Sequence, residues 1–215
     1  MAITVVIELG LLIYVLFRYK LQMTVVLAGF LLLFLALFQV AEYGICEQIG
    51  FSDTTWARFG FASITMLPIL GLHLVYSIAG KSNRRLLAVG YLGTLAWILV
   101  FIFGDIMKGA ICSGNYVIFD VTEPWEGYYY IFYDLTILIA MVQAIRFSRE
   151  TKKDTVKNAL HWLFLAYISF TVPAAIIWFL TDGADMALPS IMCGFAVIFA
   201  VLVATRTVPL VAKKR

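Results

Sequence analysis

Charged residues are scarce in this sequence: Asp, Glu, Lys and Arg together make up 13% of its 215 residues. A soluble domain carries roughly 25%, whereas here 63% of the residues are hydrophobic and the mean hydropathy is +0.95. Such a composition excludes an ordinary soluble domain. It predicts an all-α membrane protein that crosses the lipid bilayer several times.

The sequence also lacks the motifs of common active sites. It contains no nucleophile triad, phosphate-binding glycine loop, CxxC or HExxH motif, and no acidic cluster has the spacing of a dedicated metal site. The last apolar stretch contains no Lys, which excludes a retinal Schiff base there. We therefore expect neither enzymatic activity nor a metal or cofactor. The net charge of +3 does not indicate nucleic-acid binding, because the basic residues are explained by membrane topology.

Seven apolar stretches approach the length of about 20 residues that a membrane-spanning helix needs. The first has no basic residue before it and no small-residue cleavage site, so we expect it to be a retained span and not a signal peptide. The sequence thus predicts one domain, residues 1–215, forming a seven-helix bundle. Its expected spans are roughly 1–17, 22–45, 56–79, 86–104, 126–147, 159–180 and 188–205.

The basic residues lie in alternate connections between these spans. Of the 16 Lys and Arg residues, 14 fall on one side of the membrane, and only Arg58 and Lys108 fall on the other. By the positive-inside rule, the N-terminus is outside and the C-terminus is cytoplasmic. We expect the bilayer to be the plasma membrane.

The connection at 105–126 is the longest. Residues 106–112 and 116–120 read as two short strands about a turn, which predicts a small extracellular β-hairpin between the fourth and fifth helices. Cys112 lies in this hairpin and Cys46 at the outer end of the second span, so the two are candidates for a disulfide bond on an oxidising side. The sequence leaves open whether that bond forms. The third cysteine, Cys193, falls inside the last span as a small apolar residue.

A few polar residues fall within the spans, where charge is costly and usually faces the bundle interior. We expect Glu42 to pair with Arg58 at the outer ends of the second and third spans, either as a structural ion pair or as part of a pocket. Asp134 lies about 12 Å below the start of the fifth helix, four residues after Tyr130. We expect a ligand pocket that opens outward beneath the hairpin. Its predicted lining residues are Glu42, Arg58, Tyr130, Asp134 and Trp178. We expect Glu8 to lie in the hydrated mouth of the first span.

Pro68 and Pro173 predict bends in the third and sixth helices, because proline removes a backbone donor and crowds the preceding turn. Gly60, Ser63 and Gly71 share one face of the third helix, where neighbouring helices can approach closely. We expect His73 to be a hydrogen-bonded structural residue. The third helix therefore reads as the inner helix of the bundle.

Several local patterns, taken in order along nearly the whole chain, resemble the seven-helix N-terminal sensor region of bacterial and archaeal histidine kinases. The resemblance rests on Glu42, the run Trp56-Ala-Arg-Phe-Gly-Phe, Leu67-Pro68, Leu72-His73, Val172-Pro173, Leu188-Pro189 and a Phe-rich run ending in Arg206. It implies a prokaryotic sensor that converts an outward or intramembrane cue into helix movement at the cytoplasmic ends. Members of the family usually continue into a kinase or cyclic-dinucleotide domain, whereas this sequence ends at Arg215.

A sensor that relays its signal to a separate kinase or cyclase is the leading functional hypothesis. Intramembrane carboxylates and bent helices also suit a small proton-coupled transporter, although no inverted repeat is visible. A lipid-modifying enzyme or an assembly subunit is favoured less, because the polar residues are few and scattered. The small ligand, the partner and any homo-oligomer are not specified by the sequence.

Overall fold

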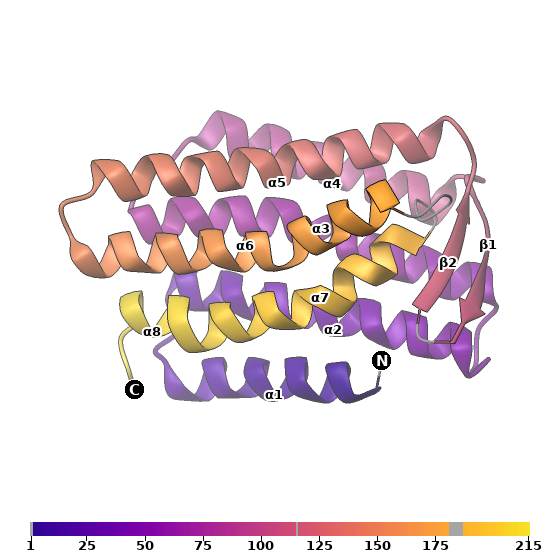
Figure 1. Ribbon diagram of the computed structural model, residues 1–215, viewed down its shortest axis with the longest axis horizontal. Helices are drawn as coiled ribbons and strands as arrows, with labels where there is room; N and C mark the ends of the chain where they lie inside the picture. The colour runs from indigo at the N-terminus through magenta and orange to yellow at the C-terminus, as the bar shows by residue number, and fades with distance from the viewer. Residues whose placement is uncertain (1, 115, 181–186) are drawn as a thin grey trace.

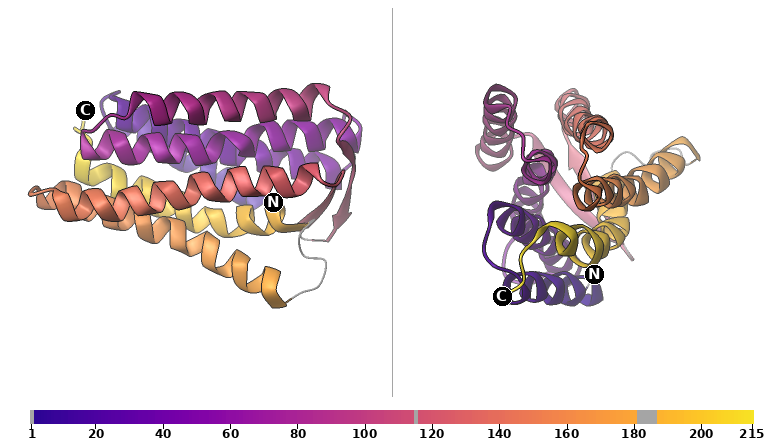
Figure 2. Two further views of the ribbon diagram at one scale, coloured as in Figure 1. Left: turned by 90° about the horizontal axis from the view of Figure 1, so that it is seen from above. Right: turned by 90° about the vertical axis from the view of Figure 1, so that its left-hand side faces the viewer.

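The computed structural model describes residues 2–114, 116–180 and 187–215 (Figure 1). Long helices lie side by side, and a small β-hairpin covers one end of the bundle (Figures 1 and 2). In chain order, the elements are α1 (Ala2–Arg18), α2 (Met23–Cys46), α3 (Asp53–Ala79), α4 (Arg84–Phe103), β1 (Met107–Ser113), β2 (Tyr116–Val121), α5 (Trp125–Glu150), α6 (Asp154–Leu180), α7 (Leu188–Leu202), the π-helical segment η2 (Val203–Thr207) and α8 (Val208–Val211).

In the described part of the chain, six helices are long and apolar enough to cross a membrane. They are α2 to α6 and the continuous stretch Leu188–Val211, which comprises α7, η2 and α8. Helix α1 has 17 residues, slightly fewer than the roughly 20 of a full span. The predicted membrane-type helical bundle is thus observed, while the count of seven spans and their orientation stay predictions.

Helix α3 lies at the centre of the bundle. In the most apolar 18-residue stretch of α3, 72% of the residues are buried, whereas in that of α4 only 11% are buried. Helix α3 contacts α2, α4, α5, α6 and β1. Small residues permit this packing: a Cβ atom added to Gly60 would lie 3.2 Å from the Cβ of Ala41 on α2. The Ser52 side chain begins the helix by accepting a hydrogen bond from the Thr55 amide at 3.3 Å. The predicted inner position of α3 is therefore confirmed.

The predicted hairpin is also confirmed. Strands β1 and β2 pair antiparallel, with Ala110 opposite Phe119 and an irregularity between Met107 and Gly109. The Phe119 ring is buried on the end of the bundle, 5.9 Å from the Phe38 ring and 5.2 Å from the Phe61 ring between centroids. A disulfide bond between Cys46 and Cys112 joins α2 to β1, with a Cα–Cα distance of 5.1 Å.

The basic connections gather at the other end of the bundle (Figure 1). The turns between α1 and α2, α3 and α4, and α5 and α6 lie there together with the C-terminal segment. That segment pairs with the first turn: the Lys20 amide donates to the Lys213 carbonyl at 2.9 Å, and the Arg215 amide donates to the Arg18 carbonyl at 3.1 Å. The separation of charge predicted from the sequence is thus present in the fold.

Both internal prolines lie within continuous helices, Pro68 in α3 and Pro173 in α6. They differ in their surroundings. Pro68 is buried among packed helices, whereas the part of α6 that carries Pro173 diverges from the bundle (Figure 2). The exposed fractions of Trp178, Phe179 and Leu180 at the end of α6 are 50%, 77% and 80%. The end of α6 therefore lies apart from the rest of the bundle.

Candidate functional site

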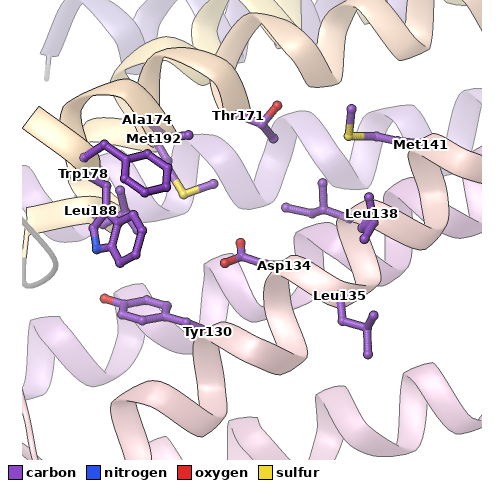
Figure 3. A pocket seen from close by; sticks show the side chains of 13 residues that line it. Tyr130, Asp134, Leu135, Leu138, Met141, Thr171, Ala174, Trp178, Leu188 and Met192 are labelled. Carbon is purple, nitrogen blue, oxygen red and sulfur yellow. The ribbon is translucent and has the colours of Figure 1, made fainter.

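A cavity of about 640 Å³ lies where α6 diverges from α5 and α7. Residues from all three helices line it, among them Tyr130 and Asp134 from α5, Trp178 from α6 and Met192 from α7. Figure 3 shows the Asp134 carboxylate and the Tyr130 and Trp178 rings around the same space. Three of the five residues predicted to line a pocket thus lie together, in a cavity large enough for a small organic ligand.

The lining of this cavity is apolar apart from a few groups. Among the described residues that line the cavity, Asp134 is the only charged one, and no Lys or Arg lies beside it. The Thr171 hydroxyl is already engaged, since it donates to the Tyr167 carbonyl at 2.9 Å. A ligand in this space would therefore meet the Asp134 carboxylate, the aromatic rings of Tyr130, Trp178 and Phe179, and a largely hydrocarbon wall.

The local sequence explains why the cavity is open. Proline at position 173 leaves the carbonyl one turn earlier without its helical donor, and the second half of α6 separates from α5 (Figure 2). The first half of α6 remains packed, with Leu160, Leu163 and Ala166 buried. The cavity is therefore formed by a helix that is fixed at one end and separated from the bundle at the other.

Arg58 does not line this cavity, and its predicted ion pair with Glu42 is wrong. The Arg58 guanidinium donates instead to the carbonyls of Ile102 and Gly104, at 3.3 Å each, and lies 4.0 Å from the exposed carboxylate of Asp105. Helix α4 ends here, and the last carbonyls of a helix have no partner within it. Arg58 therefore connects α3 to the end of α4.

Glu42 also lies away from the cavity, within a group of buried polar residues between α1, α2 and α7. Its exposed fraction is 1% and that of Glu8 is 0%, and the two carboxyls are near enough to interact electrostatically. The Ser190 side chain lies near Glu42 and accepts a hydrogen bond from the Val117 amide at 3.0 Å, and Thr4 donates to the Gln39 side chain at 2.9 Å. One predicted pocket is thus two separate sites, with Arg58 in neither.

The position of Glu8 contradicts the expected hydrated mouth. Both of its carboxyl oxygens, and one of those of Glu42, are buried and have no hydrogen-bond partner among the described residues. Helix α1 packs against α2 and α7, which removes Glu8 from solvent. The sequence did contain a signal for this position. Glu8 is the only charged residue before Arg18 in the first apolar stretch, and a carboxylate within the membrane usually faces the bundle interior because exposing its charge to lipid is energetically costly.

Two residues expected to be structural have the predicted surroundings. His73 hydrogen-bonds through Nδ1 to the Tyr91 hydroxyl at 2.9 Å, and Cys193 is a buried free thiol. Among residues 2–114, 116–180 and 187–215, no group of three or more His, Cys, Asp or Glu side chains is placed to hold a metal ion.

The fold and these two sites define a helical membrane-type bundle with a side cavity and a buried carboxyl pair. Comparison of the chain with protein-family models gives no match, and comparison with curated proteins gives none.

Proposed function

We propose that this chain is a seven-helix sensor module of a prokaryotic plasma membrane, with its N-terminus outside and its C-terminus in the cytoplasm. A small ligand binds in the cavity between α5, α6 and α7, and the resulting helix movement is relayed to a cytoplasmic signalling protein such as a kinase or a cyclase. The observation that carries this proposal is the cavity of about 640 Å³, which is bounded by a divergent helix that contains proline and has one carboxylate, Asp134, among its described lining residues.

The lining of the cavity favours a ligand with an apolar body and one cationic group. A carboxylate in mostly apolar surroundings attracts a cation strongly, and the faces of Tyr130 and Trp178 can add cation–π attraction. An anionic ligand would meet the charge of Asp134 with no compensating base among the lining residues. The opening beside α6 gives such an amphiphile a lateral route from the lipid phase.

The inner half of α6 supplies a route for the signal. It contacts α7, η2 and α8, and the Arg206 guanidinium of η2 lies 5.5 Å from the Trp162 ring centroid of α6. Beyond α8, the last residues pair with the connection between α1 and α2. A ligand that binds better when α6 lies close to α5 would favour that arrangement and move the α6 end next to the C-terminal segment.

Spin-label distances between the basic ends of α3 and α6 test this proposal. Cysteines introduced by Ser82→Cys and Asn158→Cys carry the labels, Cys193→Ala removes the free thiol, and the Cys46–Cys112 bond is retained. We expect dodecylamine to change the distance by about 2 Å, the size of a typical helix shift, and dodecanol to leave it unchanged.

Asp134→Asn supplies the matched control because it removes the charge at nearly constant shape. The variant should retain its helical content while losing the response to dodecylamine. An equal response to dodecanol, or an unaltered distance when bound dodecylamine is detected by equilibrium dialysis, would refute the sensor proposal.

The pair of buried carboxyls favours a second candidate, a proton-coupled carrier. Glu8 and Glu42 lie together away from lipid with unpartnered oxygens, and such groups commonly mark proton relays. Proton flux into proteoliposomes that is abolished by Glu42→Gln or by Asp134→Asn would support this candidate. Proteoliposomes that contain the wild-type protein and show no proton flux would exclude the carrier.

A further inference from the structure

A second hollow lies at the basic end of the bundle, far from the Asp134 cavity along α5. It is a cleft of about 460 Å³ bounded by the end of α3, the start of α4 and the last turns of α5. Four of its lining residues are cationic: Lys81, Arg84, Arg85 and Arg146. No Asp or Glu is among the lining residues, so the cleft suits an anion.

Only part of this positive charge is balanced by neighbouring protein. Glu150 pairs with Lys81 and with Arg146, the latter at 2.8 Å. Arg84 and Arg85 form no ion pair with any described residue, and both are exposed. Glu150 thus balances Lys81 and Arg146 in part, and the two arginines are available to an external ligand. Arginine suits phosphate oxygens in particular, because its planar group can donate two parallel hydrogen bonds.

Backbone geometry adds to the attraction for an anion. Asn83 caps α4 by accepting the Leu86 amide at 3.2 Å, and its carbonyl accepts the Leu87 amide at 3.0 Å. The amides of Arg84 and Arg85, the first two residues of the helix, have no acceptor within the helix. The start of a 20-residue helix therefore adds its positive dipole end to the side-chain charges.

The position of the cleft identifies the source of the anion. It lies where the apolar stretch of α3 ends and that of α4 begins. The Lys81 ammonium lies over the Phe147 ring, 4.4 Å from its centroid. Basic residues and tyrosine at the end of a span are typical of the headgroup level of a bilayer, and Tyr76 lines the cleft with the four cations. A lipid phosphate is held at this depth, whereas a dissolved phosphate must reach it from water.

We propose that this cleft is a specific binding site for the phosphate of an anionic phospholipid headgroup. Arg84 and Arg85, with the free amides of α4, bind the phosphate oxygens, and Lys81 and Arg146 supply further charge. The site is separate from the Asp134 cavity and does not depend on the sensor proposal. It differs from general attraction of basic loops to acidic lipid because it needs this cleft and these two arginines.

Native mass spectrometry of the full chain in detergent tests the site, with phosphatidylglycerol and phosphatidylcholine added in turn. We expect one phosphatidylglycerol to bind in preference to phosphatidylcholine. Arg84→Gln combined with Arg85→Gln should weaken its binding tenfold or more, since each basic residue near anionic lipid contributes about one factor of five. Circular dichroism and size-exclusion chromatography check that the variant remains folded.

Lys152→Gln combined with Lys153→Gln is the matched control. It removes the same charge from the connection between α5 and α6, outside the cleft, and should leave the affinity within about twofold. Equal weakening in the two double variants would show nonspecific surface attraction and overturn the proposal. So would equal binding of the two lipids by the wild type. A site that binds inorganic phosphate but no phosphatidylglycerol would overturn the assignment to lipid.

Discussion

The hydroxyl of Tyr167 on α6 lies directly against the Cα of Gly71 on α3. A Cβ atom added to Gly71 would overlap that hydroxyl oxygen, which is buried and has no hydrogen-bond partner among the described residues. Close contact between the central helix and the fixed half of α6 therefore depends on the absence of a side chain at position 71. The two residues form one packing unit about halfway along the bundle.

This contact predicts that Gly71→Ala destabilises the protein and that Tyr167→Phe relieves the effect. The alanine methyl group overpacks the interface, at a cost of about 1–3 kcal/mol in the free energy of unfolding. Tyr167→Phe alone removes an unpartnered buried hydroxyl and should be neutral or stabilising. Chemical unfolding in detergent of both single variants and the double variant measures the coupling. Simple addition of the two single effects would contradict the contact.

The Cys46–Cys112 disulfide closes a loop with a sequence separation of 66 residues. Replacing both cysteines with serine should lower the free energy of unfolding by about 4 kcal/mol, because the unfolded chain regains the entropy of that loop. The unfolding midpoint of the oxidised wild type, with and without a reductant, measures the same change. Cys193→Ala retains the disulfide and serves as the control. A midpoint that does not respond to reductant would show that the bond adds no stability.

Variants of Arg58 and Asp105 distinguish the contribution of hydrogen bonding to stability from that of a surface ion pair. Arg58→Gln removes the two donors to the carbonyls at the end of α4, which should cost about 1–3 kcal/mol of stability. Asp105→Asn should cost almost nothing, since its side chain is 95% exposed and lies 4.0 Å from Arg58. Thermal unfolding of the two variants provides the comparison. Similar losses in both would indicate that the ion pair, and not the carbonyl contact, holds α4.

Glu8→Leu should raise the stability of the protein by about 1–3 kcal/mol. The substitution replaces a buried carboxyl whose oxygens have no described partner with an apolar side chain that needs none. The stability of Glu8→Gln should lie between those of the wild type and Glu8→Leu. Unfolding in detergent gives the order of the three proteins. A less stable Glu8→Leu would show that the carboxyl has a structural role.

The architecture was largely predictable because its signals are local. Apolar length predicted the helices, the turn residues about Gly114 predicted the hairpin, and the depths of Cys46 and Cys112 made them disulfide candidates. Neighbour relationships across the bundle were not predictable in the same way. The three-residue spacing of Gln39 and Glu42 shows that they share a face, but not which helix that face meets.

The candidate site illustrates this limit. Tyr130 and Asp134 share one face of α5 because they are four residues apart, and this relation survives in the cavity. Pairing Glu42 with Arg58 assumed that residues at one depth face each other. In the structure, Glu42 faces Glu8 and Ser190, and Arg58 faces the end of α4. Rotation of each helix about its axis depends on packing of the whole bundle, which no single segment encodes.

The length of the uncharged part of α3, between the basic residues on either side of it, can be compared with the thickness of a bilayer. Between Arg58 and Lys81, the 22 residues contain no Asp, Glu, Lys or Arg, and the interval corresponds to about 34 Å of helix. A hydrocarbon layer is about 30 Å thick. The central helix is therefore long enough to cross an ordinary bilayer, and lipids with much shorter or longer chains would have to deform around it.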